Sequence, residues 1–275
     1  MTLHRLLPLS VVCSAVLAGC ASWGPSPERI VETATGRTLT CAELADAVRA
    51  APLALLGEQH DEQAHHQRRG ALIERLRGSG AVVVAEHLPR GEGVPLQGRP
   101  LLAALQSGGF KPEAWDWPLH QPLFEGVAAA GVPLRGGDLD DPTLKAVLKS
   151  DAGVPAPLRA LLDAAPLSAP AQAALDADLQ ESHGGAIPPA RLDTMRRAQR
   201  ARDASLLAAL QASGGRPAVL VAGNGHARGD YGVPQLWHPA GLVNVALVSP
   251  GQAVPGTYTH VWTVDPQVPV KACER

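Results

Sequence analysis

Aromatic residues are scarce in this sequence, with five Trp, two Tyr and two Phe among 275 residues. Few side chains are therefore available to stack on both faces of a large planar ligand. An excess of one charge is also lacking, because 24 Lys and Arg balance 26 Asp and Glu. Without a basic stripe to follow a phosphate backbone, the composition argues against nucleic-acid binding. The absence of a His-Glu-x-x-His motif disfavours a zincin-type metalloprotease.

The N-terminus has the pattern of an export signal. A polar start at His4 and Arg5 precedes a mainly apolar stretch over residues 6–18. This stretch is too short to cross ~30 Å of hydrocarbon, which needs about 20 residues, and is typical of a signal peptide. It ends in Leu-Ala-Gly-Cys20, which resembles the lipobox of bacterial lipoproteins. We predict a signal peptide over residues 1–19 and lipid on Cys20. The alternative is an ordinary secretory peptide in which Cys20 is incidental.

The residues after Cys20 predict a tether and then one domain. Residues 20–30 begin with small and turn-forming residues, which favours a flexible tether. Ala21, rather than Asp, follows the cysteine, and the resemblance to lipoproteins then implies the periplasmic face of the outer membrane. Cleavage leaves 256 residues of the 275, and residues 31–275 fit a single α/β domain.

Two cysteines remain in the predicted domain, Cys41 near its start and Cys273 near its end. Export places them in an oxidising compartment, where paired thiols persist. We expect a disulfide between Cys41 and Cys273. The alternative is two separate buried thiols.

Short apolar runs alternate with helical patterns along the domain. The runs predict buried strands at Leu53–Leu56, Ala81–Ala85, Val132–Leu134, Ala218–Ala222, Val243–Val248 and His260–Val264. Helical patterns lie at Glu62–Arg77, Leu119–Ala130 and Pro189–Gln211. This alternation predicts an α/β fold with a mostly parallel central sheet flanked by helices. Ala-rich segments interrupted by prolines predict a helical insert over about residues 139–190.

Polar residues follow three of the predicted strands. The first strand runs into Gly57-Glu58-Gln59-His60, the second into Glu86-His87, and the fourth into Gly223-Asn224-Gly225-His226. In open α/β sheets, ligands bind at the carboxyl ends of the strands. We therefore expect Glu58, His60, Glu86 and His226 to share one edge of the sheet.

Two carboxylates and two imidazoles are suited to a divalent transition metal or to general acid–base chemistry. We predict Glu58, His60, Glu86 and His226 as metal ligands. Glu58 and Glu86 are also candidate proton acceptors. The helix that follows His60 begins with acidic residues and carries His65 and His66 in its first turns.

A set of segments in a fixed order resembles the ChaN-like haem-binding uptake lipoproteins, which share a superfamily with Tiki and TraB metal-dependent proteins and erythromycin esterases. The resemblance covers about residues 53–248. It is carried by the segments LLGEQHDEQAHHQRRGALIERL, VVVAEHLPRG, WDW, HQPL, SHG, RAQRARD and AGNGHARGDYGVPQLW. It implies an α/β fold and two different functions.

The first implied function is binding of haem or an iron compound as a stage of iron uptake. The family's haem ligation is associated with a tyrosine backed by histidine. This chain departs from that pattern, because its two tyrosines, Tyr231 and Tyr258, both lie outside the predicted insert. His183 and Tyr231 remain as candidate axial ligands of haem. His65 is the third predicted cofactor-binding residue, as a hydrogen-bonding partner of the metal site.

The second implied function is metal-dependent hydrolysis. In the wider superfamily, a GxxH element, a strand-end Glu and a GNxH element form the site. The matching residues here are His60 after Gly57, then Glu86, and then Asn224 with His226. Glu58, Glu86 and Asn224 are the predicted catalytic residues, with Asn224 either stabilising an oxyanion or fixing a loop. Arg202 and Asp203 are a predicted ion pair beside the site.

A third function class is a non-catalytic lipoprotein scaffold that binds a partner through the insert. The predicted partners are thus the membrane, through lipid on Cys20, haem or another small molecule, and a second copy of the chain. No nucleic-acid partner is expected.

Overall fold

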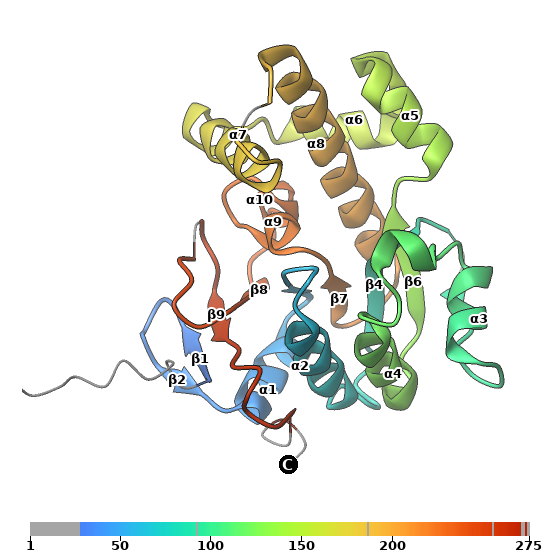
Figure 1. Ribbon diagram of the computed structural model, residues 1–275, viewed down its shortest axis with the longest axis vertical. Helices are drawn as coiled ribbons and strands as arrows, with labels where there is room; N and C mark the ends of the chain where they lie inside the picture. The colour runs from blue at the N-terminus through green and yellow to red at the C-terminus, as the bar shows by residue number, and fades with distance from the viewer. Residues whose placement is uncertain (1–27, 92, 186, 255, 271–272, 274–275) are drawn as a thin grey trace, which may run out of the picture.

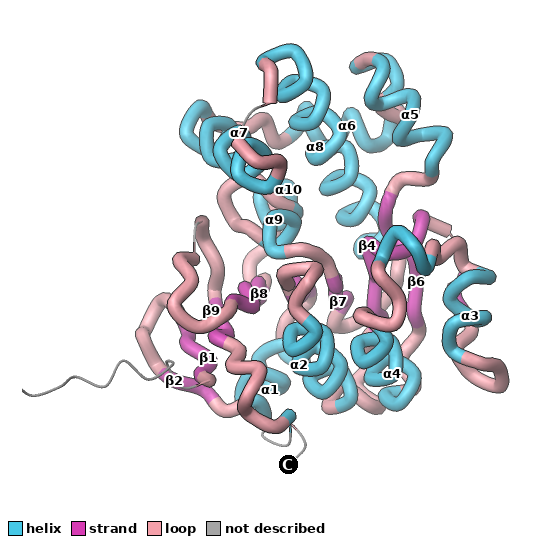
Figure 2. Tube along the Cα trace, in the orientation of Figure 1, coloured by secondary structure: helices cyan, strands magenta, loops and turns pink. Residues whose placement is uncertain are grey.

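The computed structural model describes residues 28–270, apart from 92, 186 and 255, together with Cys273. These residues form a nine-stranded sheet with helices on both faces (Figures 1 and 2). The predicted signal peptide, the lipidation site at Cys20 and most of the tether lie outside the described residues.

The elements follow one another along the chain as alternating strands and helices. The strands are β1 (Arg29–Glu32), β2 (Thr38–Leu39), β3 (Leu53–Leu56), β4 (Val82–Pro89), β5 (Gly93–Val94), β6 (Leu134–Asp138), β7 (Ala218–Val221), β8 (Val243–Val248) and β9 (His260–Thr263). The α-helices are α1 (Cys41–Ala50), α2 (Gln63–Glu74), α3 (Leu101–Ser107), α4 (Gln121–Ala130), α5 (Asp141–Lys149), α6 (Ala156–Ala164), α7 (Ala169–Ser182), α8 (Pro189–Ala212), α9 (Asn224–Ala227) and α10 (Val233–Leu236). Two 3₁₀ turns, η1 (Pro112–Trp115) and η2 (Asp151–Gly153), complete the set.

The sheet has the strand order β2-β1-β9-β8-β3-β7-β4-β6-β5. Its six central strands, from β9 to β6, are all parallel. The outer strands β1, β2 and β5 pair antiparallel with their neighbours. The predicted fold class, a mostly parallel α/β sheet with a helical insert, is confirmed.

Alternating side chains of the central strands build one core on each face of the sheet. Ala54 and Leu56 of β3 pack toward α1, α2 and α4, whereas Leu53 and Leu55 pack toward α8 and the helices around it. Figure 1 shows these two layers, with α1, α2 and α4 on one side and α5, α6 and α8 on the other. Burial on both faces explains why these strands read as continuous apolar runs.

Two predicted strands differ from the observed ones by more than one residue. β6 begins at Leu134, after Pro133, rather than at Val132. β4 continues through Glu86 and His87 to Pro89, with a shift in its register to β6 after Ala85. Glu86 therefore lies within an irregular strand end instead of a loop.

The insert is helical, as expected, and contains α5, η2, α6 and α7 before α8 begins. On the other face, α2 and α4 approach closely because Gly70 and Gly126 meet where they cross, and a Cβ atom on Gly126 would overlap the Gly70 backbone. This contact places the start of α4 beside α2. Among the described residues, no helix is both long and apolar enough to cross a membrane.

Contacts link the two ends of the described chain. Cys41 and Cys273 lie at disulfide distance, with their Cα atoms 5.2 Å apart. Nearby, the buried Arg68 of α2 makes a bidentate ion pair with Glu28 and donates to the backbone carbonyls of Asp265 and Val268.

If the disulfide forms, the Cys273→Ser variant will unfold at a lower temperature than the parent, because the loop that the disulfide closes becomes free in the unfolded chain. The expected loss of unfolding free energy is about 2–5 kcal/mol. Thermal unfolding with and without a reductant measures it, and the reductant should destabilise only the parent. Equal effects of the reductant on both proteins would contradict the pairing.

Candidate functional site

Three strand ends meet at one edge of the sheet. β3, β7 and β4 are neighbours in the sheet order, and each supplies polar groups at its carboxyl end. The structure brings together Glu58, His60, Glu86 and His226 at the floor of a cavity of about 820 Å³. The opposite wall of this cavity comes from α7 and α8 and from the segment between β8 and β9, with Asp178, Glu181, Gln199, Arg202 and Val254 among its residues.

His60 faces the cavity and is backed by Glu58. The Nδ1 atom of His60 lies 2.8 Å from Oε1 of Glu58, and its Nε2 atom lies 3.5 Å from Oε1 of Glu86. The His60 side chain is 52% exposed, whereas both carboxylates are buried. Gly223 leaves room for the His60 ring, because a Cβ atom on residue 223 would lie 2.9 Å from Nε2 of His60.

His226 lies on the other side of Glu86 and is also backed by a carboxylate. Its Nδ1 atom lies 2.6 Å from Oδ1 of Asp203, a fully buried residue of α8. Its Nε2 atom lies 3.3 Å from Oε2 of Glu86. Burial alone would lower the pKa of His226, but the negative charges of Asp203 and Glu86 outweigh burial and raise this pKa.

Glu86 therefore lies between two imidazoles. Its Oε1 atom accepts a hydrogen bond of 2.9 Å from the backbone N–H of Gly223. Its Oε2 atom has no hydrogen-bond partner among the described residues. Burial alone would raise the pKa of Glu86, but His60 and His226 outweigh it and lower this pKa to about 2. The side chain is thus a buried carboxylate that needs positive charge around it.

Glu58 is the centre of a second, inner cluster. Its carboxylate forms an ion pair with Arg69 of α2, and its Oε2 atom lies 2.8 Å from Nδ1 of His66. The Nε2 atoms of His120 and His87 lie 3.5 and 3.6 Å from its Oε1 atom. Burial lowers the pKa of His66 to about 4 and that of His120 to about 3.

Asn224 lines the cavity, and its side chain also links the ends of β7 and β8. Its side chain donates to the Leu247 carbonyl at 2.7 Å and accepts from the Leu247 N–H at 3.2 Å. Its backbone N–H donates to the carbonyl of Glu58. These three hydrogen bonds fit the loop-fixing role, which is one of the two predicted for Asn224.

The residues predicted for cofactor binding lie away from the cavity floor. Nδ1 of His65 accepts a hydrogen bond from the Gln59 N–H and braces the loop after β3. Tyr231 is fully buried, and its hydroxyl donates to Asp178, which does not fit the expected ligand role of a phenolate. Burial and the Asp178 charge raise the pKa of Tyr231. His183 is exposed at the end of α7 and is not among the residues that line the cavity.

Arg202 and Asp203 do not pair with each other as predicted. Arg202 makes a bidentate ion pair with Asp138 at the end of β6, at 2.7 and 2.9 Å. Asp203 instead contacts His226. Consecutive helix residues point in different directions, which explains the two separate partners.

Residues 44–236 match the protein family described as haem-binding uptake, Tiki superfamily, ChaN. This match spans well over half of the chain. The chain belongs to this family. The resemblance found in the sequence is thereby confirmed.

A solved structure gives the same result for the fold. ChaN of Campylobacter jejuni, in a structure that describes cofacial haem binding to that protein, superposes with a TM-score of 0.70. The match covers 86% of this chain and 97% of that chain at 17% sequence identity, so it shows a shared ChaN fold. No curated protein matches the chain.

Several site residues of this ChaN-family member escaped the sequence analysis. His87 directly follows Glu86, and the strand-end rule could have selected it. His66, Arg69 and His120 reach the site from α2 and from the start of α4, and the sequence analysis assigned them no role. Their common feature is burial against a carboxylate, which only the folded chain reveals.

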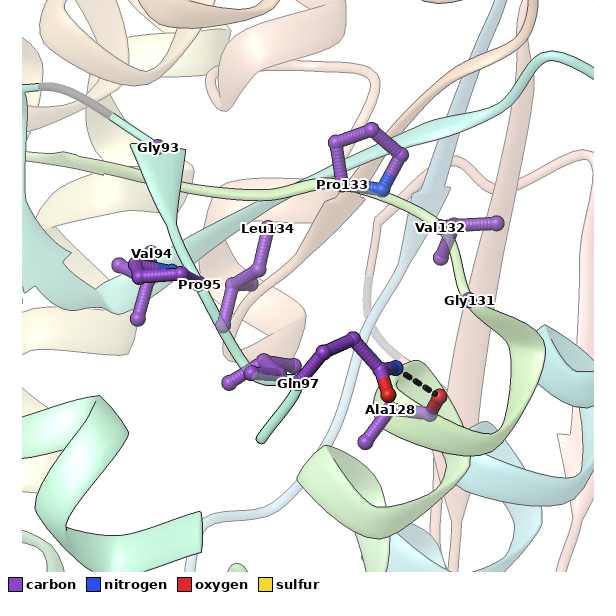
Figure 3. Close-up of a pocket in the computed structure, with 10 residues that line it drawn as sticks. Gly93, Val94, Pro95, Gln97, Ala128, Gly131, Val132, Pro133 and Leu134 are labelled. Atoms are coloured by element: carbon purple, nitrogen blue, oxygen red, sulfur yellow. Dashed lines mark hydrogen bonds between the residues drawn. The ribbon is translucent and has the colours of Figure 1, made fainter. Parts of the chain in front are cut away.

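Another cavity, at the β5 edge of the sheet, contains no group for such chemistry. It is lined by residues from β5, the segment after it and the loop before β6 (Figure 3), and none of these residues is ionisable. Gln97 closes one side by donating to the Ala128 carbonyl. The strand-end cavity is therefore the candidate site.

The Asn224→Ala variant should lose stability even when no metal ion or haem is present, since two hydrogen bonds between the ends of β7 and β8 disappear. The expected cost is about 1–3 kcal/mol of unfolding free energy. Urea unfolding in the presence of a chelator measures it. Unchanged stability together with a lost activity would instead favour the oxyanion role.

Proposed function

We propose that the strand-end cavity binds a divalent transition metal ion and uses it to hydrolyse a polar substrate. The observation that carries this proposal is the position of Glu86 between two imidazoles, each backed by a buried carboxylate. Two histidines and one carboxylate form a common ligand set for zinc and non-haem iron.

Glu86 lies at ligand-like distances from both imidazoles, one through each of its oxygens. Its Oε1 atom lies 3.5 Å from Nε2 of His60, and its Oε2 atom lies 3.3 Å from Nε2 of His226. Two ligands bound at ~2.1 Å in a tetrahedron lie about 3.4 Å apart. Gly223 leaves room at this place, since a Cβ atom would come within 2.9 Å of Nε2 of His60. With Nδ1 of each ring turned toward a carboxylate, Nε2 is left as the ligand atom.

Charge balance also favours a cation. Glu58, Glu86 and Asp203 are all buried, and Arg69 is the single guanidinium in contact with this group among the described residues. Arg202, which also lines the cavity, is paired with Asp138. Buried charges are costly unless they are paired, so a divalent ion would stabilise the cluster.

The residues around the cavity then have distinct roles. A bound divalent ion supplies Lewis acidity toward a carbonyl or phosphoryl oxygen. Glu58 and Asp203 orient His60 and His226, which makes them positioning residues. Glu86 serves as the carboxylate ligand, and Gln199 and Arg202 form the wall that a polar substrate would contact.

If this proposal holds, the His226→Ala variant will lose the tightly bound metal ion, because one of three ligands is removed. The Asp203→Asn variant will bind it about 10–100-fold more weakly through the loss of an orienting carboxylate. Elemental analysis and chelator competition measure both effects. His183→Ala, which changes an exposed histidine outside the cavity, is the matched control. Parent protein that retains no metal, or His226→Ala protein that retains all of it, would contradict the proposal.

A second candidate function, haem binding in iron uptake, is favoured by the family match. We propose that haem binds at the surface of α7 and not in the strand-end cavity. The cavity contains the carboxylates of Glu58, Glu86, Asp178 and Glu181, which would repel haem propionates. His183 is exposed, and its Nδ1 atom lies 3.0 Å from the Leu179 carbonyl, which leaves Nε2 free as an axial ligand. A second copy of the chain would cover the other haem face.

If haem binds at α7, haem added to the parent will give a Soret band. In the His183→Ala variant this band should be shifted or absent, because the axial ligand is gone. The His226→Ala variant is the control and should keep the band. Absorption titration with analytical ultracentrifugation tests both haem binding and dimer formation. An identical Soret band in the parent and His183→Ala would exclude His183 as the ligand.

We further propose that the chain is exported and anchored to the periplasmic face of the outer membrane by lipid on Cys20. The sequence Leu-Ala-Gly-Cys20 supports this proposal. The Cys20→Ser variant should lose labelling by radioactive palmitate and should leave the membrane fraction. Cys13→Ser, which changes the predicted signal peptide only, should behave as the parent. Equal labelling of the parent and Cys20→Ser would contradict lipidation there.

A further inference from the structure

The cavity wall opposite the proposed metal ion carries two carboxylates on one face of α7. Asp178 and Glu181 lie about one turn apart on this helix, and both line the cavity. The fully buried Tyr231 donates to Oδ2 of Asp178 at 2.7 Å. A Cβ atom on Gly225 would lie 3.4 Å from the same oxygen. Asp178 is therefore held beside the loop that carries His226.

The guanidinium groups that line the cavity are already bound by other carboxylates. Arg202 forms a bidentate pair with Asp138. Arg228 forms a bidentate pair with Asp230. Nη1 of Arg228 lies 3.9 Å from Oδ1 of Asp178, which is beyond hydrogen-bonding distance. In both guanidinium groups, the Nε and Nη2 donors that could clamp a phosphate or carboxylate of a substrate are thus occupied.

The cavity floor indicates independently that this space holds a ligand. Oε2 of Glu86 is buried and has no hydrogen-bond partner among the described residues, which is rare in folded proteins. The proposed metal ion would compensate the charge of Glu86, and Arg69 already pairs with Glu58. The negative charge that remains on the cavity wall is that of Asp178 and Glu181.

We infer that the substrate of this cavity carries a primary ammonium group, which Asp178 and Glu181 bind at the α7 wall. The inference rests on the proposed hydrolytic function and identifies the substrate class of that site. An ammonium group offers three donors to carboxylate oxygens. Oδ1 of Asp178 accepts no hydrogen bond from the described residues, so it is available to such a donor. The same two charges disfavour anionic substrates.

The test measures the binding of 1,5-diaminopentane to the full, detergent-solubilised chain from which a chelator has removed metal ions. The N,N′-diacetyl derivative of this diamine has the same carbon chain without charge and is the control ligand. Asp178→Asn removes one charge and keeps an oxygen that can accept from Tyr231, so this variant should fold. Asp163→Asn changes an exposed carboxylate of α6 outside the cavity and is the matched control. Calorimetry at low salt measures each affinity.

We expect the parent and Asp163→Asn to bind the diamine with equal affinity and not to bind the diacetyl derivative. Asp178→Asn should bind the diamine about 10-fold more weakly, because a hydrogen bond between two charged groups is lost. Equal affinities of the parent and Asp178→Asn for the diamine, or no binding of the diamine to the parent, would overturn the inference.

Zinc-loaded protein separates this inference from the metal proposal. Aminoalkyl hydroxamates of graded chain length and their N-acetyl derivatives share one zinc-binding group and differ only in the ammonium charge. At the best length, the parent should bind the amino compound more tightly than its acetyl derivative, and Asp178→Asn should bind the two alike. If the parent binds no hydroxamate, the metal proposal fails, and the diamine result still decides the inference. If zinc-loaded parent binds both compounds equally at every length, the inference fails and the metal site stands.

Discussion

The arrangement of the chain at the carboxyl ends of β3, β7 and β4 depends on the buried carboxylate of Glu58. A carboxylate without solvent must be surrounded by donors or cations, or it is too costly to keep ionised. Here the partners come from different parts of the chain: His60 from the same loop, His66 and Arg69 from α2, and His120 from the start of α4. Arg69 also donates to the Leu56 carbonyl at the end of β3. The buried charge of Glu58 thus links the end of β3 to α2 and to the start of α4, which lie in the same layer.

The same arrangement is repeated on the other side of the site. Asp203 orients His226 as Glu58 orients His60, and Glu86 lies between the two imidazoles. The result is a preorganised set of nitrogen and oxygen donors at the floor of a large polar cavity. The chain belongs to the ChaN family, and the carboxylates that line the cavity are the reason we propose haem binding elsewhere on the molecule.

The sequence revealed the parts of this structure that depend on local pattern. Strands β3 and β8 were predicted at their observed bounds, since burial on both faces makes a strand uniformly apolar, and the strand-end rule selected Glu58 and Glu86. The short edge strands β2 and β5 carry no such pattern. Helix α1 was missed although Thr40 and Glu43 form a capping box. Asp203 was paired with the wrong residue, because the partner of a buried charge is set by tertiary packing.

The most direct test of the central claim is a crystal structure of the zinc-loaded protein with anomalous scattering measured at the zinc edge. A zinc peak beside Glu86, at ~2.1 Å from Nε2 of both His60 and His226, is the predicted result. An anomalous map without a peak at the strand ends, in protein that binds zinc in solution, would contradict the account. The buried carboxylates would then serve only to hold the fold together.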